Sequence, residues 1–312
     1  MGQLCPKRQP CPFGRPAPLE RLWRRRAQRC WRRRISHLEH VGLPHLGGAG
    51  RAEVAYVSQT HNQKEPTAMT ETTKQHFNWV DVHPMPSPLP DGIIERFLAL
   101  EDLSATVADA LDAFGVNGIL GASTLVPTLP EERIVGRVIT LRNVPGRMDP
   151  YRAVSEGSWL MAEIHGIELA EAGDVIVISG LPEVSNMGGI VAACATRGGL
   201  AGAIVDGAVR DVGQSRRRGF PIWSRDISPA TGKWRGSSVE INSTISVAGV
   251  TVASGDIVVA DETGVCFVPI ELVDPVIARC EAIDKKESEM FADIAAGLPM
   301  TDVIERLYGT LD

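Results

Sequence analysis

Short apolar runs alternate with helix-like segments through the middle of the chain, and this order restricts the fold more than any other feature. β-Rich runs begin at Ile134, Asp174 and Ala201, and each is bounded by Gly, Pro or Asp. Between them the sequence predicts one helix around residues 151–165 and another over about 189–197. Strands that alternate with helices in this way are typical of an α/β domain.

Strand signals continue further along the chain without intervening helices. A short run begins at Phe220, and beyond Ile241 the sequence reads TISVAGVTVASGDIVVADETGVCFVP. Its four apolar stretches are separated by Gly and Asp. This pattern predicts antiparallel or mixed strands joined by tight turns.

Two further helices are predicted at the ends of this strand-rich part. The first has Ser104 as its N-cap and stops at Gly115, and its apolar face comprises Val107, Ala110, Leu111 and Phe114. The second lies in ELVDPVIARCEAIDKKESEMF, where apolar residues recur at helical spacing: Leu272, Val276, Cys280 and Ile283. We therefore expect residues 91–312 to form one α/β domain with a C-terminal helix that packs on a neighbouring subunit.

Charge is divided unevenly along the chain. Residues 1–68 hold thirteen Lys or Arg and four Glu, whereas residues 69–312 hold nineteen basic and thirty-four acidic residues. The block RLWRRRAQRCWRRR at 21–34 opposes compaction, so residues 1–68 are predicted to be a disordered leader. Its composition is compatible with a nucleic-acid-binding arm or an organellar transit peptide. We favour a third interpretation, in which translation starts at Met69 and the leader is not part of the native protein.

Residues 69–90 are predicted to be a Pro-rich lead-in to the domain, since prolines at 84, 86, 88 and 90 prevent a helix.

Composition also argues against several classes of protein. No apolar run approaches the roughly 18 residues that would span a bilayer, which argues against a membrane protein. The six Cys include no Cys-x-x-Cys pair, so a cytoplasmic location is expected. The acidic body shows no basic stripe with aromatic residues, which argues against nucleic-acid binding.

The segment MGGIVAACATRGGLAGAIVDGAVRD, residues 187–211, concentrates the residues suited to chemistry. Its glycines open a predicted helix, where unpaired backbone N–H groups and the positive helix end favour a carboxylate or phosphate. The strand that follows ends at Arg210 and Asp211. If strand and helix pack as a β/α unit, the bound anion lies within reach of the Arg210 guanidinium. The residues expected to bind it are Gly188, Gly189, Ile190 and Val191.

Asp211 offers a hard oxygen ligand for Mg²⁺ or Mn²⁺, ions that often accept one or two carboxylates and keep several waters. A small 2-oxo acid suits this combination, with its carboxylate on the backbone amides and its keto oxygen facing the metal and Arg210. Cleavage of a C–C bond beside that ketone leaves enolate charge on the oxygen. A metal ion and a fixed guanidinium stabilise this charge.

GAIVDGAVRD, followed by GVTVASGDIVVADETGVCFVP, resembles the RraA-like proteins, which include 4-hydroxy-4-methyl-2-oxoglutarate aldolases and oxaloacetate decarboxylases. The resemblance extends from about Ile93 to Ala295. It implies a swivelling β/β/α fold, a homotrimer or hexamer, a divalent metal and C–C cleavage that yields pyruvate enolate. It also implies that Arg210 binds substrate, Asp211 ligates the metal and residues 188–191 receive the substrate carboxylate.

One position departs from that family pattern. The lyases have an Asp, then twenty residues, then Arg-Asp, which places the expected Asp at Gly189. A glycine cannot orient metal-bound water or move a proton, so the acid–base group is missing from its usual place. Asp206, four residues before Arg210, is one substitute. The resemblance also implies an acid from an adjacent subunit, for which Glu287 is the candidate.

Other polar residues have simpler structural interpretations. Asp256 and Asp261 lie in SGD and ADETG, where Asp side chains are predicted to cap backbone groups of turns. His165 is predicted to interact with the dipole at a helix C-terminus. Residues 216–218, three consecutive arginines, are expected to be a solvated run.

Together these observations favour a metal-dependent lyase that releases pyruvate from a 4-carboxylated 2-oxo acid, by retro-aldol reaction or decarboxylation. The alternative is a non-catalytic RraA-like regulator that binds a protein partner, which Gly189 keeps open. A third hypothesis retains the enolate chemistry and lets Gly189 make room for a bulkier substrate group.

Overall fold

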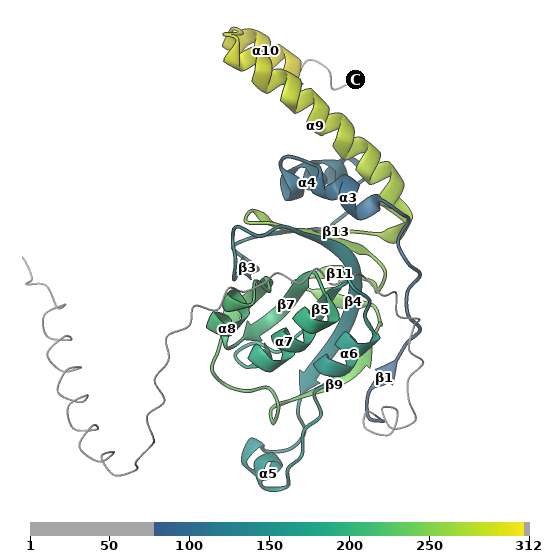
Figure 1. Ribbon diagram of the computed structural model, residues 1–312, viewed down its shortest axis with the longest axis vertical. Helices are drawn as coiled ribbons and strands as arrows, with labels where there is room; N and C mark the ends of the chain where they lie inside the picture. The colour runs from purple at the N-terminus through teal and green to yellow at the C-terminus, as the bar shows by residue number, and fades with distance from the viewer. Residues whose placement is uncertain (1–77, 309–312) are drawn as a thin grey trace, which may run out of the picture. The chain divides into compact units, whose positions relative to one another are not determined.

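The computed structural model describes residues 78–308 (Figure 1). The predictions for the leader, for the start at Met69 and for the lead-in before residue 78 lie outside the described residues. In the described part, every helix is too short or too polar to cross a bilayer.

Helices and strands alternate through the first part of the domain, and strands dominate the second; the labels are those of Figure 1. Up to residue 198 the elements are β1 (Asp81–Val82), α3 (Ile93–Leu98), α4 (Leu103–Ala113), β2 (Ile119–Gly121), β3 (Val126–Pro127), β4 (Ile134–Pro145), α5 (Pro150–Ser155), α6 (Glu163–Leu169), β5 (Val175–Ser179), β6 (Ser185–Met187) and α7 (Gly189–Gly198). The remaining elements are β7 (Gly202–Val209), α8 (Val212–Arg217), β8 (Ile222–Ile227), β9 (Gly236–Ile241), β10 (Ile245–Val247), β11 (Val250–Val252), β12 (Ile257–Ala260), β13 (Gly264–Val268), a 3₁₀ turn (Ile270–Leu272), α9 (Val273–Ala295) and α10 (Met300–Tyr308).

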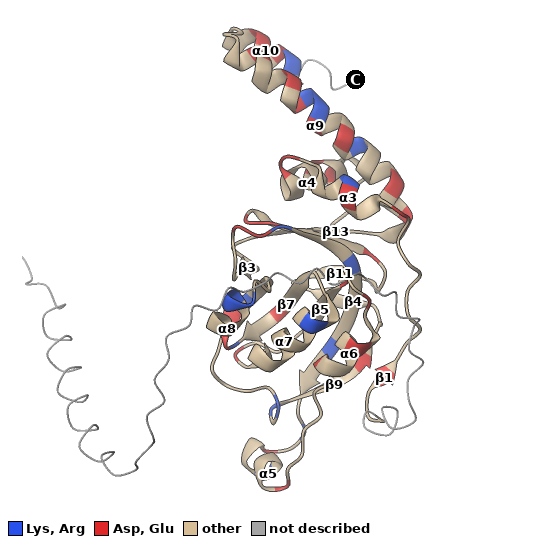
Figure 2. Ribbon diagram, in the orientation of Figure 1, with Lys and Arg blue, Asp and Glu red and all other residues tan. Residues whose placement is uncertain are grey.

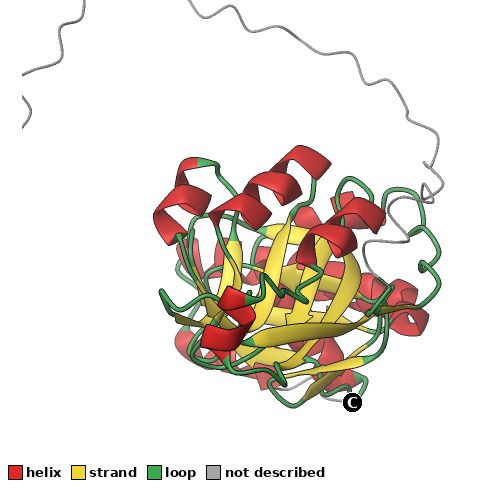
Figure 3. Ribbon diagram, turned by 90° about the horizontal axis from the view of Figure 1, so that it is seen from below, coloured by secondary structure: helices red, strands yellow, loops and turns green. Residues whose placement is uncertain are grey.

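The long strand β4 organises the main sheet, whose order is β2-β13-β12-β4-β5-β7-β8-β3. Residues 134–137 of β4 pair antiparallel with β12, and residues 138–142 pair parallel with β5. An antiparallel half and a parallel half therefore share one strand, and the sheet curls between them (Figure 3). The result is the mixed α/β fold with a C-terminal helix that the sequence predicts.

Apolar side chains form three clusters around this sheet. The first lies inside the curl and contains Trp223 and Phe267, two of the largest buried side chains. The second lies between the parallel half and the helices α6 and α7. The third lies between β4, β12 and β13 on one side and α3, α4 and α9 on the other. The helices α6 and α7 cover the face of the parallel half. Polar residues at the ends of its strands lie at the edge of the sheet, where they can contact solvent.

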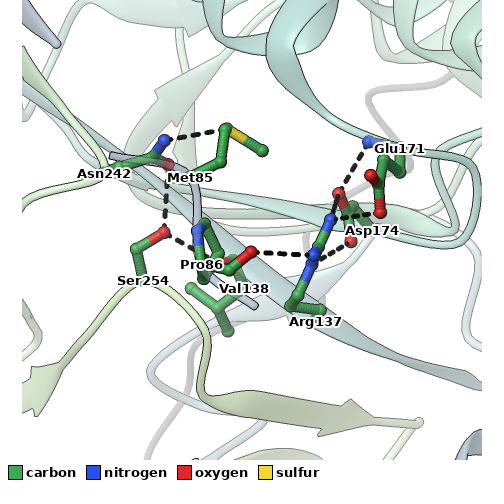
Figure 4. Close-up of polar contacts among 8 residues, drawn as sticks. All are labelled: Met85, Pro86, Arg137, Val138, Glu171, Asp174, Asn242 and Ser254. Atoms are coloured by element: carbon green, nitrogen blue, oxygen red, sulfur yellow. Dashed lines mark hydrogen bonds and ion pairs between the residues drawn. The ribbon is translucent and has the colours of Figure 1, made fainter. Parts of the chain in front are cut away.

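The lead-in over residues 78–90 runs extended along the sheet, without a helix, as predicted for this part. β1 pairs parallel with β9. The Pro86 carbonyl accepts a hydrogen bond from Arg137 Nη1 at 3.1 Å. Arg137 also donates twice to the Asp174 carboxylate, at 2.9 Å each, and once to Glu171 (Figure 4). This ion-pair cluster fixes the lead-in against β4.

The predicted strands are confirmed, including the turns after Ile241. β10 and β11 pair antiparallel, and so do β12 and β13. Ala248 and Gly249 join the first pair with φ of 49° and 91°. Positive φ at both central residues suits a two-residue turn whose twist matches the strands.

The helix predicted around residues 151–165 is wrong, whereas the one over 189–197 is confirmed as α7. Two short helices, α5 and α6, replace the first, and Gly157 with φ of 64° follows the end of α5. The left-handed residue stops the first helix. His165 consequently lies within α6 and is buried, so its prediction as a C-terminal dipole partner is also wrong.

The N-cap predicted at Ser104 is wrong as well. α4 begins one residue earlier, at Leu103. The Ser104 N–H and hydroxyl both donate to the Asp261 carboxylate, at 2.8 and 2.7 Å. Asp261 also accepts from the Thr263 N–H in its own turn, which confirms its capping role. Gly115, with φ of 66°, follows the helix end as predicted.

The apolar face predicted for the C-terminal helix is buried over the first part of α9. Val276 and Cys280 of α9 are fully buried against the sheet and α4. Further along α9, acidic and basic residues alternate on the surface (Figure 2), and Phe291 is 59% exposed.

Candidate active site

The end of β7 and the start of α7 lie at the same edge of the sheet. β6 leads into α7 and pairs parallel with β7, with Met187 opposite Val209. The Arg210 N–H donates to the Met187 carbonyl at 3.0 Å. This pairing places Arg210 and Asp211 beside the loop at residues 188–191.

Asp211 adopts a left-handed backbone conformation, with φ of 56°. Asp tolerates this region better than most residues, although it costs about 1 kcal/mol or more. Its Oδ2 accepts the Gly189 N–H at 3.0 Å. The carboxylate therefore lies at the N-terminus of α7, where the helix dipole favours negative charge.

Arg210 and Asp211 form a loose pair, with 3.6 Å between Arg210 Nε and Asp211 Oδ2. Their side chains are 40% and 39% exposed, and such an exposed pair contributes little to stability. A Cβ on Gly188 would lie 3.1 Å from both of these atoms. Glycine at this position thus allows both side chains to approach the loop closely.

Gly189 is enclosed rather than open. A Cβ placed on it would lie 2.7 Å from Gln214 Oε1 and 3.2 Å from the Asp211 Cβ. The Gln214 amide fills the space that a side chain at position 189 would enter. The hypothesis that Gly189 makes room for a bulkier substrate group is therefore not supported by this arrangement.

The backbone N–H groups of the loop differ in whether they already donate a hydrogen bond. The Gly189 N–H is committed to Asp211, whereas the N–H groups of Ile190 and Val191 belong to the first helical turn, which has no intrahelical acceptor for them. These two amides are the donors best placed for a ligand anion.

A cavity of about 370 Å³ opens beside this loop. Its wall includes Gly188, Ile190, Val191 and Arg210. The other lining residues come from the start of α6 and the segment before it, from β6 and from the segment before β9: Trp159, Met161, Glu163, Ile164, Ser185, Asn186, Met187, Thr231 and Lys233. The volume suits a small organic acid. Asp211 is not among the lining residues and adjoins Gly189 and Arg210, which it contacts.

Glu163 lines the same cavity, although no sequence pattern predicted it as a site residue. It is only 5% exposed, and burial raises the pKa of its carboxyl from 4.5 to about 7, against the opposing effect of hydrogen bonds with its own backbone and Asn143. An acidic residue in a first helical turn is normally explained by the helix dipole. No local pattern distinguishes Glu163 from such residues, because its burial is a tertiary property.

The residues present fit a weakly coordinated divalent cation. Both contacts of the Asp211 carboxylate are made by Oδ2, and the side chain is open to solvent. Among residues 78–308 no group of three or more His, Cys, Asp or Glu could hold a metal. The donor set suits an ion such as Mg²⁺ or Mn²⁺ that takes most of its ligands from water and substrate.

The other candidate residues are engaged elsewhere. Asp206 Oδ1 lies 2.6 Å from the Arg225 guanidinium, and Asp206 Oδ2 accepts the Ala248 N–H at 2.6 Å. Its carboxylate is thus committed to β8 and to the β10–β11 turn. Glu287 lies on α9, outside the residues that line the cavity. Arg216 is not fully solvated, since its Nε donates to the Thr128 carbonyl at 2.9 Å.

The fold defines an α/β domain built on a curled mixed sheet, with a small cavity at the edge of its parallel half. The family model described as "RraA-like: Aldolase/RraA" matches residues 104–267, just over half of the chain. The chain therefore belongs to the RraA-like family.

Proteins similar in sequence to this chain include one named as an aldolase and one whose name states no activity. A Thermus thermophilus protein named 4-hydroxy-4-methyl-2-oxoglutarate aldolase is 30% identical over 139 residues, which cover 44% of this chain and 76% of that protein. Protein DlpA of Legionella pneumophila is 30% identical over 196 residues, or 62% of this chain. The match spans only 30% of the length of DlpA.

Solved structures share the fold. Streptomyces coelicolor RraAS2, described as an unusual member of the RNase ES inhibitor RraA protein family, has a TM-score of 0.54 at 25% identity, over 66% of this chain and 98% of the other. An uncharacterized protein from Pseudomonas syringae has a TM-score of 0.59 at 24% identity, over 70% and 98%.

Proposed function

We propose that this protein is a divalent-metal-dependent lyase that cleaves a C–C bond in a 4-carboxylated 2-oxo acid and releases pyruvate. The reaction is a retro-aldol cleavage of a 4-hydroxy-2-oxo acid or the decarboxylation of oxaloacetate. The observation that carries the proposal is the convergence of the Arg210 guanidinium, the Asp211 carboxylate and the first-turn amides of α7 at one edge of the sheet.

Each of these groups has a distinct role in the proposed reaction. The amides of Ile190 and Val191 bind the substrate carboxylate, because they are unpaired and lie at the positive end of α7. Arg210 donates to the keto oxygen and stabilises the charge that grows there. Asp211 holds Mg²⁺ or Mn²⁺. The cation, when bound, supplies Lewis-acid stabilisation of the enolate oxygen.

The names of similar proteins support this proposal. A Thermus thermophilus relative is named 4-hydroxy-4-methyl-2-oxoglutarate aldolase, and both products of that cleavage would be pyruvate. We further propose a cytoplasmic homotrimer or hexamer that binds neither nucleic acid nor membrane. The acidic composition of residues 69–312 supports the first of these exclusions.

Pyruvate release by the full-length protein tests the proposal. Oxaloacetate and 4-hydroxy-4-methyl-2-oxoglutarate are supplied with Mg²⁺ or Mn²⁺, and the metal-catalysed background without protein is subtracted. We expect pyruvate from at least one substrate and complete loss of release with EDTA. Absence of metal-dependent pyruvate from both substrates overturns the proposal.

A second candidate is a non-catalytic regulator that binds a protein partner. Gly189 favours this candidate, since it lacks the carboxylate of the family's lyases. RraAS2, described as an unusual member of the RNase ES inhibitor RraA protein family, has the same fold. Co-purification of a defined RNase with this protein, together with the absence of turnover, would support the regulator over the enzyme.

A further inference from the structure

The cavity wall includes a buried carboxyl group that the proposed binding roles do not use. Glu163 lines it together with Gly188 and Arg210. Its Oε1 is buried and accepts no hydrogen bond from the described residues. A buried carboxyl oxygen without a donor is costly. Because Glu163 also lines the cavity, its carboxyl group is suited to a ligand group or a proton that arrives there.

A fixed polar network holds the start of α6 in place. The Ala162 N–H donates to Ser238 Oγ at 2.8 Å, and Ser238 Oγ donates to Asn143 Oδ1 at 2.7 Å. Asn143 Nδ2 in turn lies 3.2 Å from Asn186 Oδ1. Every member of this network is buried. Because Ala162 directly precedes α6, the network fixes the backbone from which the Glu163 side chain reaches the cavity wall.

The charged groups around Glu163 are few. Arg210 and Lys233 line the same cavity, and His165 and Glu168 follow on α6. Burial is the main reason that the pKa of Glu163 rises to about 7. At neutral pH its protonated and ionised forms therefore coexist, which suits a group that both donates and accepts a proton.

The proposed reaction lacks such a group in its usual place. Gly189 has no side chain, and Asp206 is bound to Arg225 and Ala248. A guanidinium group carries donors only and has no acceptor for a proton. An enolate of pyruvate must nevertheless gain a proton on carbon before it leaves as pyruvate.

We propose that Glu163 is the catalytic acid–base residue of this cavity, and that its carboxyl group exchanges protons with C3 of the pyruvate enolate. This inference rests on the proposed function. It assigns to α6 the proton transfer that a carboxylate at position 189 would otherwise perform.

With Glu163 in this role, every proton in both reactions has a donor and an acceptor. In retro-aldol cleavage the Glu163 carboxylate takes the C4 hydroxyl proton as the C3–C4 bond breaks, the electron pair of that bond forms the enolate, and C4 becomes a carbonyl carbon. The Glu163 carboxyl then returns the proton to C3. In decarboxylation C4 leaves as CO₂, the Glu163 carboxyl protonates C3, and water restores its proton.

Exchange of the pyruvate methyl protons in D₂O isolates this step from C–C cleavage. Full-length protein with Mg²⁺ is incubated with pyruvate, and loss of the methyl signal is followed by proton NMR. We expect the wild type to catalyse exchange and Glu163→Gln to slow it by about 100-fold or more. Glu168→Gln, which changes an exposed residue on the same helix, is the matched control and should exchange at the wild-type rate.

Two further measurements separate a catalytic role from a structural one. Oxalate, a planar mimic of the enolate, should bind Glu163→Gln with Mg²⁺ within a few-fold of the wild-type affinity. Glu163→Asp keeps an ionisable group and should recover part of the exchange lost in Glu163→Gln. Equal exchange by wild type and Glu163→Gln, or no recovery in Glu163→Asp, overturns the assignment.

The outcomes distinguish this inference from the proposed function. If the wild type releases no pyruvate and exchanges no methyl protons, the proposed function fails and the role of Glu163 fails with it. If the wild type does both and Glu163→Gln does both equally well, only the role of Glu163 is overturned.

Discussion

The side chain of Gln214 occupies the position next to Gly189: a Cβ on that glycine would lie 2.7 Å from Gln214 Oε1 and 2.9 Å from its Cδ. The two residues come from neighbouring helices, α7 and α8. A neutral amide from one helix therefore fills the volume that a carboxylate on the other would need.

This contact predicts coupling between the two positions. Gly189→Asp alone should lower the free energy of unfolding by about 1–3 kcal/mol, because the new side chain displaces Gln214. Gln214→Ala alone should change it little, and the double variant should recover most of the loss. Urea unfolding of all four proteins gives the coupling energy. Strictly additive effects would show that the two side chains do not compete for this space.

Asp211→Asn tests the proposed metal ligand with little change to the fold. Asn tolerates the left-handed conformation at this position and keeps an oxygen that can accept the Gly189 N–H. Loss of the negative charge should weaken Mn²⁺ binding by about 10-fold or more, because affinity depends on the number of charged ligands; calorimetry or EPR of free Mn²⁺ measures it. Glu262→Gln, an exposed carboxylate in the β12–β13 turn, is the control. Unchanged Mn²⁺ affinity in Asp211→Asn would remove Asp211 from the site.

Arg210→Ala should reduce kcat by about 100- to 1,000-fold, since the proposed contact stabilises charge that develops in the transition state. KM should change less than kcat, because the substrate carboxylate is bound by backbone amides. The exposed Arg217→Ala on α8 should leave both constants unchanged. Steady-state kinetics of pyruvate release measures both constants. A rise in KM with an unchanged kcat would assign Arg210 to ground-state binding only.

The pKa of Glu163 gives stability a specific pH dependence. Between pH 4.5 and about 7 the folded protein keeps a proton on Glu163 that the unfolded chain releases. The free energy of unfolding should therefore fall as pH rises through this window, by up to about 3 kcal/mol relative to Glu163→Gln. Urea unfolding of both proteins at several pH values measures the difference. Parallel pH profiles would indicate that the carboxyl is not buried as described.

Removal of the Arg137 guanidinium should destabilise the fold strongly. The side chains of Arg137 and Asp174 are 4% and 5% exposed, so Arg137→Ala leaves a buried, unpaired carboxylate. We expect a loss of about 3–5 kcal/mol in unfolding free energy. Arg152→Ala, which breaks an exposed pair with Glu156, should cost less than about 1 kcal/mol. Similar losses in denaturant unfolding would show that the burial of the Arg137 pair is unimportant.

Much of the fold could be predicted from the sequence because its signals are local. Alternating β-rich runs and helices predicted the α/β class, and the glycines and aspartates after Ile241 predicted the antiparallel turns. The prediction failed where a boundary depended on tertiary contacts. Ser104 bonds to Asp261, 157 residues away, so its capping pattern was misleading. Gly157 divides a region that periodicity had assigned to a single helix.

The same distinction between local sequence signals and tertiary contacts applies to the candidate site. The sequence by itself determined that Arg210 and Asp211 follow a strand and that two glycines open a helix, because strand ends and helix starts have short-range signatures. Only the tertiary structure decided that Gln214 fills the space at Gly189 and that Glu163 is buried at the cavity wall. Both depend on packing between segments distant in sequence, and burial, which sets the pKa of a carboxyl, exists only once those segments have come together.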